Sequence, residues 1–157
     1  MNTFKSMDYG WMRHALLLAQ RAAEEGEVPV GAVVVYDGDI VGEGWNRSIA
    51  LNDPTAHAEI LCLRRAGRFL NRHIFPDCTM YTTLWPCPMC DNAMLQAQIP
   101  RVVSGAETFS WVAETRFNKS NLLREGPIME EECRSIFIEW LKKNERFEIL
   151  EREGLYQ

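Results

Sequence analysis

The chain of 157 residues suits a single domain, spanning 1–157, with a sizeable hydrophobic core. Its apolar content of 46% and charged content of 25% are ordinary for a globular protein. Because 22 acidic residues outnumber 17 basic ones, we expect no general attraction to a polyphosphate backbone, which argues against a dedicated nucleic-acid binder but leaves room for a local basic patch.

The first twenty residues predict neither a signal peptide nor a membrane span. Their apolar run, LLLA at 16–19, is short and lies within an amphipathic pattern that includes Arg13 and His14. We therefore expect a cytoplasmic protein without membrane association. In that compartment the five cysteines are thiols or metal ligands rather than a disulfide framework.

The first third of the chain predicts a helix followed by a hairpin. Residues 8–25 repeat apolar side chains at three- and four-residue spacing, with Asp8 as the expected cap and Gly26 as the end. Two β-branched runs then flank Asp37-Gly38, a strong hairpin signal.

The remaining chain alternates helices and strands as far as residue 106. A helix over 56–68 ends at Gly67, and a strand (78–85), a helix (88–98) and a strand (101–106) follow. Residues 107–128 are irregular, 129–143 are helical, and 146–151 are either a last short strand or a helix extension. This order favours an α/β protein, a three-layer α/β/α sandwich whose mixed five-stranded sheet begins with the hairpin.

The stretch PTAHAEI, at 54–60, places His57 and Glu59 one residue apart among alanines. Taken alone, it indicates an exposed helix start with Thr55 as cap, because short His-x-Glu strings arise by chance. A second stretch downstream changes this interpretation.

That second stretch is PCPMC, at 86–90. The spacing of Cys87 and Cys90 lets both thiolates reach one ion from the first turn of a helix, where the dipole helps to lower their pKa values. A redox pair would need neither His57 nor Glu59. A four-thiolate structural zinc site would need a second close cysteine pair, which the other three cysteines do not supply. The third interpretation joins His57 to the two cysteines.

The three-ligand interpretation predicts a catalytic zinc site formed by His57, Cys87 and Cys90. Three protein ligands leave the fourth tetrahedral position for water, whose pKa zinc lowers to about 7. Glu59 cannot easily share the metal with His57, but it can reach that water and move protons. His-x-Glu followed by Pro-Cys-x-x-Cys is the signature of the zinc-dependent deaminases.

On these residues the sequence resembles the cytidine deaminase superfamily, and more narrowly its branch of tRNA adenosine, guanine and fungal-type cytosine deaminases. The resemblance covers about residues 8–108 and is densest in EVPVGAVVV, GEGWNRSIALNDPTAHAEI and YTTLWPCPMC. It implies the three-layer fold, a zinc ion (Zn2+), a hydrolytic deamination that releases ammonia, and an oligomer, which we expect to be a homodimer.

The resemblance also implies substrate contacts. It places the Asn46 side chain on the substrate, and backbone groups of Gly31 and Ala32 on ring edges. Trp85 departs from the small or acidic residue that relatives commonly carry before Pro-Cys, so we expect it to stack on a flat ring, together with Trp111.

Three functions fit these residues. We expect first a deaminase of a free aminated nucleobase or related heterocycle, cytosine-like first and guanine second, because the C-terminal third is acidic and lacks an arginine-rich tail helix. The alternative is a tRNA adenosine-to-inosine deaminase, favoured by VPVGAVVV and NDPTAHAE, with the arginines of 64–72 as a candidate RNA patch. A catalytically inactive, zinc-stabilised binding protein is disfavoured because Glu59 is intact.

Overall fold

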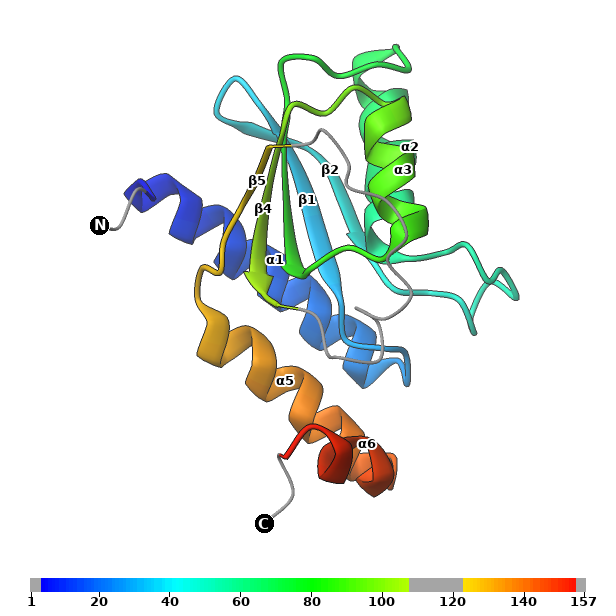
Figure 1. Ribbon diagram of the computed structural model, residues 1–157. Coiled ribbons are helices and arrows are strands. Elements are labelled where there is room, and N and C mark those ends of the chain that lie inside the picture. The colour runs from blue at the N-terminus through cyan, green and yellow to red at the C-terminus, as the bar shows by residue number, and fades with distance from the viewer. Residues whose placement is uncertain (1–3, 108–122, 155–157) are drawn as a thin grey trace.

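The computed structural model describes residues 4–107 and 123–154, which form a five-stranded sheet between two helical layers (Figure 1). In chain order the elements are α1 (Ser6–Glu24), β1 (Gly31–Tyr36), β2 (Asp39–Trp45), α2 (Ala58–Leu70), β3 (Thr79–Leu84), α3 (Pro88–Gln96), β4 (Arg101–Ala106), β5 (Leu123–Glu125), α5 (Glu130–Lys143) and α6 (Phe147–Arg152). The predicted α/β fold with a mixed five-stranded sheet is confirmed.

The strands lie in the order β2-β1-β3-β4-β5. Strand β1 is antiparallel to both β2 and β3, whereas β3, β4 and β5 run parallel to one another. The hairpin between β1 and β2 turns at Asp37 and Gly38, which both have positive φ (50° and 79°), as a tight hairpin turn requires. The hairpin prediction is therefore confirmed.

Helices α2 and α3 cover one face of the sheet, and α1 and α5 cover the other (Figure 1). Successive strand residues alternate between the two faces. The α2/α3 face packs Ala32, Val34, Met80 and Val102, whereas the α1/α5 face packs Val33, Val35, Tyr81 and Val103. Because β1 is buried on both faces, its sequence, GAVVVY, is a continuous apolar run rather than an alternating one.

A glycine lets α2 approach the edge strand β2 closely. A Cβ added to Gly44 would lie 2.0 Å from the carbonyl oxygen of Ala58, so no larger residue fits there. Beside this contact, the Oδ1 atom of Asn46 accepts a hydrogen bond from the backbone N–H of Ala58 at 3.2 Å. The first turn of α2 is thereby fixed to the end of β2.

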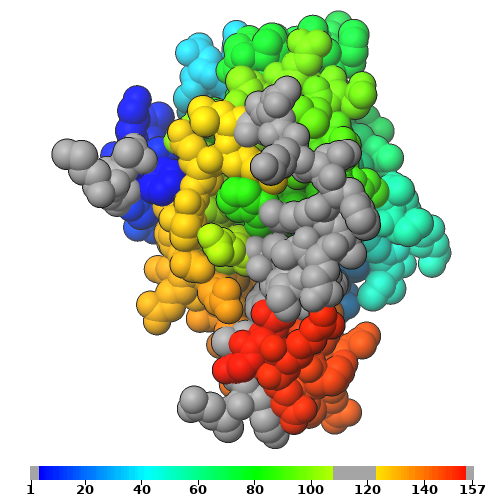
Figure 2. All heavy atoms as spheres, in the orientation of Figure 1, coloured from blue at the N-terminus to red at the C-terminus, as the bar shows by residue number. Residues whose placement is uncertain are grey.

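Two predictions about the C-terminal third are revised by the structure. The fifth strand is β5, which lies within the stretch expected to be irregular; its three residues pair only with β4 and are too few to show a periodicity. The open choice for 146–151 is settled as a helix, α6, whose Leu150 packs against Phe137 and Leu141 of α5. These two helices gather at one end of the molecule, away from α2 and α3 (Figure 2).

Two helix boundaries also differ from the predicted ones. Helix α1 begins at Ser6, so Asp8 is its third residue rather than its cap, and the Asp8 carboxylate accepts the backbone N–H of Lys5 at 2.9 Å. Helix α2 runs through Gly67 and ends at Leu70, because Asn71 adopts the left-handed conformation that terminates helices. No helix within residues 4–107 and 123–154 is long and apolar enough to cross a membrane.

Candidate metal and catalytic site

The structure brings together the three residues predicted to bind a metal. Among the described residues, His57, Cys87 and Cys90 form a group whose ligand atoms all lie within 4.8 Å of one another. The Nδ1 atom of His57 is 3.6 Å from the sulfur of Cys87 and 3.6 Å from the sulfur of Cys90. Residues 30 and 33 positions apart in the chain thus converge on one point.

This spacing fits a tetrahedral zinc ion. Zinc binds histidine nitrogen at about 2.0 Å and thiolate sulfur at about 2.3 Å, so tetrahedral angles place nitrogen and sulfur about 3.5 Å apart. The two measured nitrogen–sulfur distances of 3.6 Å agree with that value. One imidazole and two thiols are also the donor types that zinc prefers.

All three donors lie at the starts of helices. His57 is the N-cap of α2, Cys87 is the N-cap of α3, and Cys90 lies in the first turn of α3. Pro88 occupies the first helical position of α3, where its missing N–H costs no helical hydrogen bond. Both helix dipoles therefore direct their positive ends toward the cluster and favour thiolates there.

Glu59 lies beside this cluster and is buried. Only 3% of its surface is exposed, which excludes the solvent-facing position that PTAHAEI alone suggested. Its Oε1 atom accepts a hydrogen bond from the Thr82 hydroxyl at 3.1 Å, and its Oε2 atom lies 3.4 Å from the Cys90 sulfur. The carboxyl group is thus held next to the metal-binding atoms from two sides.

Thr82 was not among the residues that the sequence singled out. It is fully buried in β3, and its hydroxyl also lies 3.1 Å from the carbonyl oxygen of Leu84. A hydroxyl has one proton, so Thr82 can donate to either Glu59 or Leu84 at a time. A polar residue in a strand buried on both faces was the available signal, because such a hydroxyl needs a partner.

The pKa values of the side chains in the cluster favour the binding of a cation. Hydrogen bonds from Cys90 and His57 lower the pKa of the Cys87 thiol to about 4, although burial opposes this. The proton shared with Cys87, together with burial, raises the pKa of Cys90, and the hydrogen bond with Cys87 raises the pKa of His57. Burial raises the pKa of Glu59. A divalent metal ion held by His57, Cys87 and Cys90 would replace the protons that these three side chains share.

Three predicted substrate residues have clear packing roles. Asn46 is 7% exposed and fixes the start of α2. Gly31 faces α1, where an added Cβ would lie 2.0 Å from the carbonyl oxygen of Ala15, and its N–H donates to the Thr83 hydroxyl at 3.1 Å. Ala32 is fully buried and pairs with Thr82 across β1 and β3. Their contacts with a substrate stay predictions.

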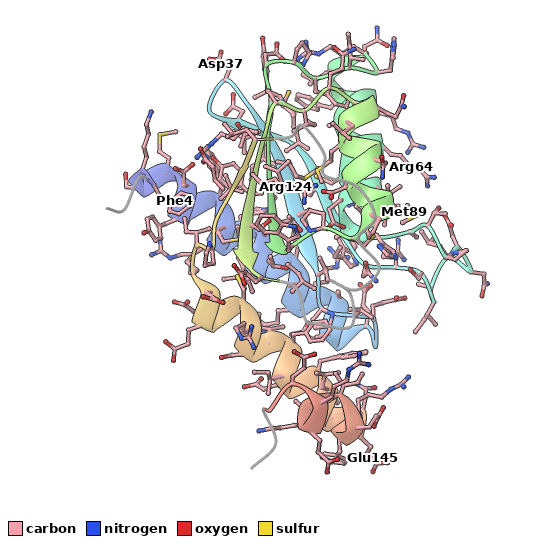
Figure 3. All side chains as sticks on the ribbon, viewed as in Figure 1. Phe4, Asp37, Arg64, Met89, Arg124 and Glu145 are labelled. Carbon is pink, nitrogen blue, oxygen red and sulfur yellow. The ribbon has the colours of Figure 1, made fainter. Side chains whose placement is uncertain are left out.

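Trp85 lies two residues before Cys87 and is covered on one side by an arginine. The guanidinium of Arg124, from β5, lies 5.3 Å from the centre of the Trp85 ring and pairs with the buried carboxylate of Asp91 in α3. Figure 3 shows Arg124 over the middle of the sheet. Stacking of Trp85 on a substrate stays a prediction, and Trp111 lies outside the described residues.

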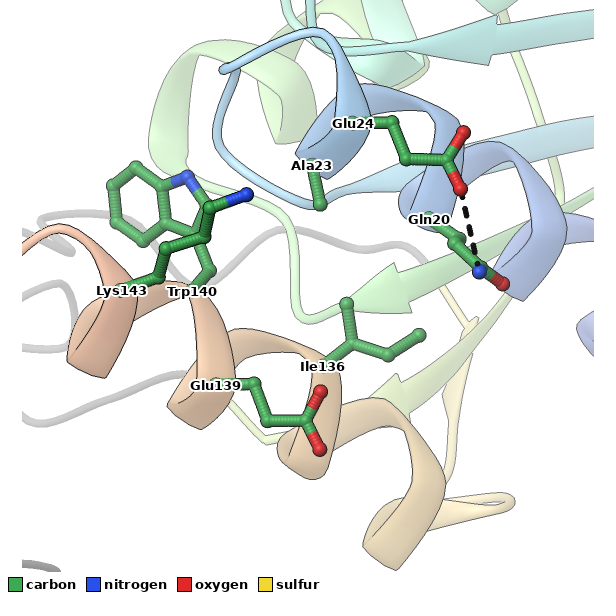
Figure 4. Close-up of a pocket in the computed structure, with 7 residues that line it drawn as sticks. All are labelled: Gln20, Ala23, Glu24, Ile136, Glu139, Trp140 and Lys143. Carbon is green, nitrogen blue, oxygen red and sulfur yellow. Dashed lines mark hydrogen bonds between the residues drawn. The ribbon is translucent and has the colours of Figure 1, made fainter.

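A groove between α1 and α5 lies on the opposite side of the sheet from the cluster (Figure 4). Its volume is about 350 Å³, and its lining residues are Gln20, Ala23, Glu24, Ile136, Glu139, Trp140 and Lys143. It contains neither a cysteine nor a histidine, so it does not share the chemistry of the metal cluster.

The fold and the site define a class of protein. A family model described as the cytidine and deoxycytidylate deaminase zinc-binding region matches residues 5–106, and the chain belongs to this family. It is therefore a member of a zinc-binding deaminase family, whose enzymes are hydrolases acting on C–N bonds. The residues that could hold the zinc are His57, Cys87 and Cys90.

Individual members of the family show which deaminases this chain is similar to. The chain is 41% identical over 147 residues to a tRNA-specific adenosine deaminase of Buchnera aphidicola subsp. Schizaphis graminum. The matched region covers 89% of this chain and 97% of that protein. A tRNA-specific adenosine deaminase of Buchnera aphidicola subsp. Baizongia pistaciae is 36% identical over 149 residues, covering 88% and 91%. A structure solved in a study of A-to-I editing by tRNA:A34 deaminases superposes with a TM-score of 0.74 at 34% identity, covering 82% and 99%.

These relatives contradict our expectation of a free nucleobase substrate, cytosine-like first and guanine second. Two relatives that match nearly the whole chain, at 41% and 36% identity, are named for an adenosine in tRNA and not for a free base. The expectation was wrong because it rested on the net charge, on the acidic C-terminal third and on the absence of an arginine-rich tail helix. RNA contacts depend instead on where the basic residues lie in the folded chain.

Proposed function

We propose that this chain is a tRNA adenosine deaminase that converts adenosine to inosine at position 34. The observation that carries the proposal is its 41% identity, over nearly its whole length, to a tRNA-specific adenosine deaminase. The likeness to a structure from work on tRNA:A34 deaminases supports the same position. The reaction consumes one water, releases ammonia and replaces the amino group on C6 of adenine with an oxygen.

The proposed metal ligands are His57, Cys87 and Cys90. When bound, zinc activates a water molecule as a nucleophile at neutral pH. Glu59 accepts a proton from the attacking water and delivers it to the ring nitrogen; it then accepts the second proton, from the hydroxyl group now on C6, and delivers it to the leaving amine. Its burial supports this role, because burial raises the pKa of the Glu59 carboxyl group above its ordinary value and so makes it a better proton acceptor.

The two oxygens of Glu59 have different tasks in this proposal. Thr82 holds Oε1 by its hydroxyl and so fixes the direction of the carboxyl group. The thiol of Cys90 donates to Oε2, but metal binding requires the thiolate, which has no proton to donate. With a metal held by Cys90, Oε2 would have no thiol proton to accept and would be available for proton transfer.

The proposal treats residues 1–157 as one deaminase domain that works in the cytoplasm as a homodimer. Its RNA partner replaces the small-molecule substrate that the charge balance suggested. The position of Trp85 beside Pro86 and Cys87 supports a contact with the target base or its neighbour.

The test is ammonia release by the purified, zinc-loaded chain. The substrates are an anticodon stem-loop with adenosine at position 34, the same stem-loop with guanosine there, and free adenine, adenosine, cytosine and guanine. We expect turnover of the adenosine stem-loop alone. Turnover of a free base, with none of the stem-loop, would overturn the proposal.

A further inference from the structure

Three arginines surround one tryptophan at the edge of the sheet. The guanidinium groups of Arg21, Arg65 and Arg47 lie 4.0, 4.6 and 5.7 Å from the centre of the Trp45 ring. The ring itself is only 6% exposed. We call Arg21, Arg47 and Arg65 the Trp45 arginine cluster.

The cluster is assembled from distant parts of the chain. Arg21 comes from α1 on one face of the sheet and Arg65 from α2 on the other, and Arg47 follows the edge strand β2. Arg65 is anchored by a hydrogen bond from Nη1 to the carbonyl oxygen of Glu43 at 2.8 Å. A sequence window shows only isolated arginines, because the fold alone brings these three together.

The cluster carries an excess of positive charge. Among the described residues, Glu25 is the one carboxylate that pairs with it, at 3.2 Å from Arg21 and 3.9 Å from Arg47, and Glu25 also accepts the indole N–H of Trp45 at 3.0 Å. The nearby carboxylate of Glu43 lies 3.3 Å from His14 instead. Three cations against Glu25, and against Glu43 with a neutral His14, leave a local charge of about +1 on a chain whose net charge is −5.

Two other arginines of the patch considered from sequence are paired with carboxylates. Arg64 pairs with Asp53 at 3.8 Å, and Arg72 pairs with Asp77 at 2.6 Å. Arg72 also stacks on Tyr36, at the hairpin end of β1. Arg65 therefore differs from both, because it has a backbone partner and no carboxylate in the described chain.

The cluster lies at the same end of the sheet as the metal site. Trp45 pairs with Gly31 at the end of β2 and directly precedes Asn46. Asn46 in turn bonds the N–H of Ala58, which stands between His57 and Glu59 in the chain. A strand of RNA whose target base enters the site would have its flanking backbone near this edge.

We propose that the Trp45 arginine cluster binds phosphates of the RNA strand next to the target adenosine. The inference rests on the proposed function and adds the surface that lets an acidic chain hold a polyanion. Guanidinium groups bind phosphate oxygens in a bidentate way, and Trp45 pre-orders their planes by stacking. Arg21, which is 57% exposed, offers the most accessible contact.

The test is the salt dependence of stem-loop binding by the zinc-loaded full chain. We expect R21Q/R65Q to weaken binding and to flatten the plot of log affinity against log salt by about one unit for each arginine lost. The control is R72Q, which removes one arginine at the other end of the sheet and should leave the slope unchanged, whereas each single variant, R21Q or R65Q, should flatten it by about one unit. Glu25→Gln keeps an acceptor for Trp45 and should strengthen binding.

Comparing R21Q/R65Q with a variant that keeps both charges separates a loss of RNA binding from a loss of folding. R21K/R65K retains both charges, so its slope should stay near that of the wild type even if stacking on Trp45 is lost. An unchanged slope for R21Q/R65Q, in a protein that still edits the stem-loop, would overturn the inference alone. If the wild type neither binds nor edits the stem-loop, the proposed function fails instead.

Discussion

The two faces of the sheet each bury a polar cluster, and the two clusters are built in opposite ways. On the α1/α5 face, the Asp8 carboxylate accepts the Tyr81 hydroxyl at 2.5 Å and pairs with Arg101 at 3.1 Å. Arg101 also binds Glu125 at 2.6 Å. On the α2/α3 face, the buried Glu59 has a hydroxyl and a thiol as partners, and among the described residues the His57 ring is the cationic group beside it.

The difference shows in the pKa shifts of the two carboxyl groups. Burial tends to raise the pKa of Asp8, but hydrogen bonds from Arg101 and Tyr81 outweigh it and hold that pKa below its ordinary value of 3.8. Burial dominates at Glu59 and raises its pKa. A carboxylate held by cations stabilises the fold, whereas a carboxyl group denied them is available for proton transfer.

The largest expected effect comes from removing a ligand on the α2/α3 face. Cys87→Ala leaves two donors, so we expect zinc content to fall from one ion per chain to well below half, with loss of measurable deamination. Metal analysis of the purified protein checks this, with Cys133→Ala as the control for a buried cysteine outside the cluster. Full zinc content in the Cys87 variant would remove Cys87 from the ligand set.

The next largest effect is expected from a substitution at the same cluster that removes proton transfer but keeps zinc binding. Glu59→Gln conserves shape but cannot accept the proton, so kcat should fall by about 10²–10⁴-fold while zinc content stays at one per chain. Its midpoint of thermal unfolding should not drop, because the native carboxyl group gains no cation there. Activity within about tenfold of the wild type would exclude Glu59 as the proton carrier.

On the other face, the corresponding substitution should affect stability and not activity. Asp8→Asn breaks the pair with Arg101, and we expect unfolding at pH 7 to become easier by about 2 kcal/mol with kcat unchanged. The folded pKa of Asp8 is depressed, so its contribution is present above pH 3.8 and disappears as the pH falls through the folded value. Denaturant unfolding at pH 7 and below pH 3 measures the difference in unfolding free energy between Asp8→Asn and the wild type, with the exposed Asp39→Asn as control. The same difference at both pH values would contradict the prediction.

The smallest effect concerns two adjacent threonines that face opposite ways. Thr82→Val removes one hydrogen bond to Glu59, worth about 1 kcal/mol, so kcat should fall about fivefold with KM unchanged, and Thr82→Ser should restore it. Thr83→Val instead removes the acceptor for the Gly31 N–H and should lower stability while leaving kcat intact. Equal kcat for all three variants would show that Thr82 does not position Glu59.

Much of this could be predicted from sequence because the relevant signals are local. The periodicities of α1, α2 and β1–β4 and the turn at Asp37-Gly38 each lie within one window, and so does each half of the metal motif. The two halves could be joined because one histidine and two cysteines have a specific chemistry in common. The metal-site prediction therefore needed no knowledge of the sheet order.

The rest depended on contacts between distant segments. Strand β5 is defined by its pairing with β4. Helix α2 ends before Asn71, which adopts the left-handed conformation, and not at Gly67, where the sequence predicted the end. Thr82 contacts Glu59 across 23 residues, and the arginines around Trp45 come from α1, from α2 and from the segment after β2. The substrate was misjudged for the same reason, because total charge contains no information about where charges gather in space.

The most direct test of the account is the product of the reaction, read by mass spectrometry of a digested anticodon stem-loop. The stem-loop carries adenosine at position 34 and at least one further adenosine in the loop, and it is incubated with the zinc-loaded wild type and with Glu59→Gln. The account predicts inosine at position 34 with the wild type only. Absence of inosine with folded, zinc-loaded wild type, or equal inosine with both proteins, would contradict it.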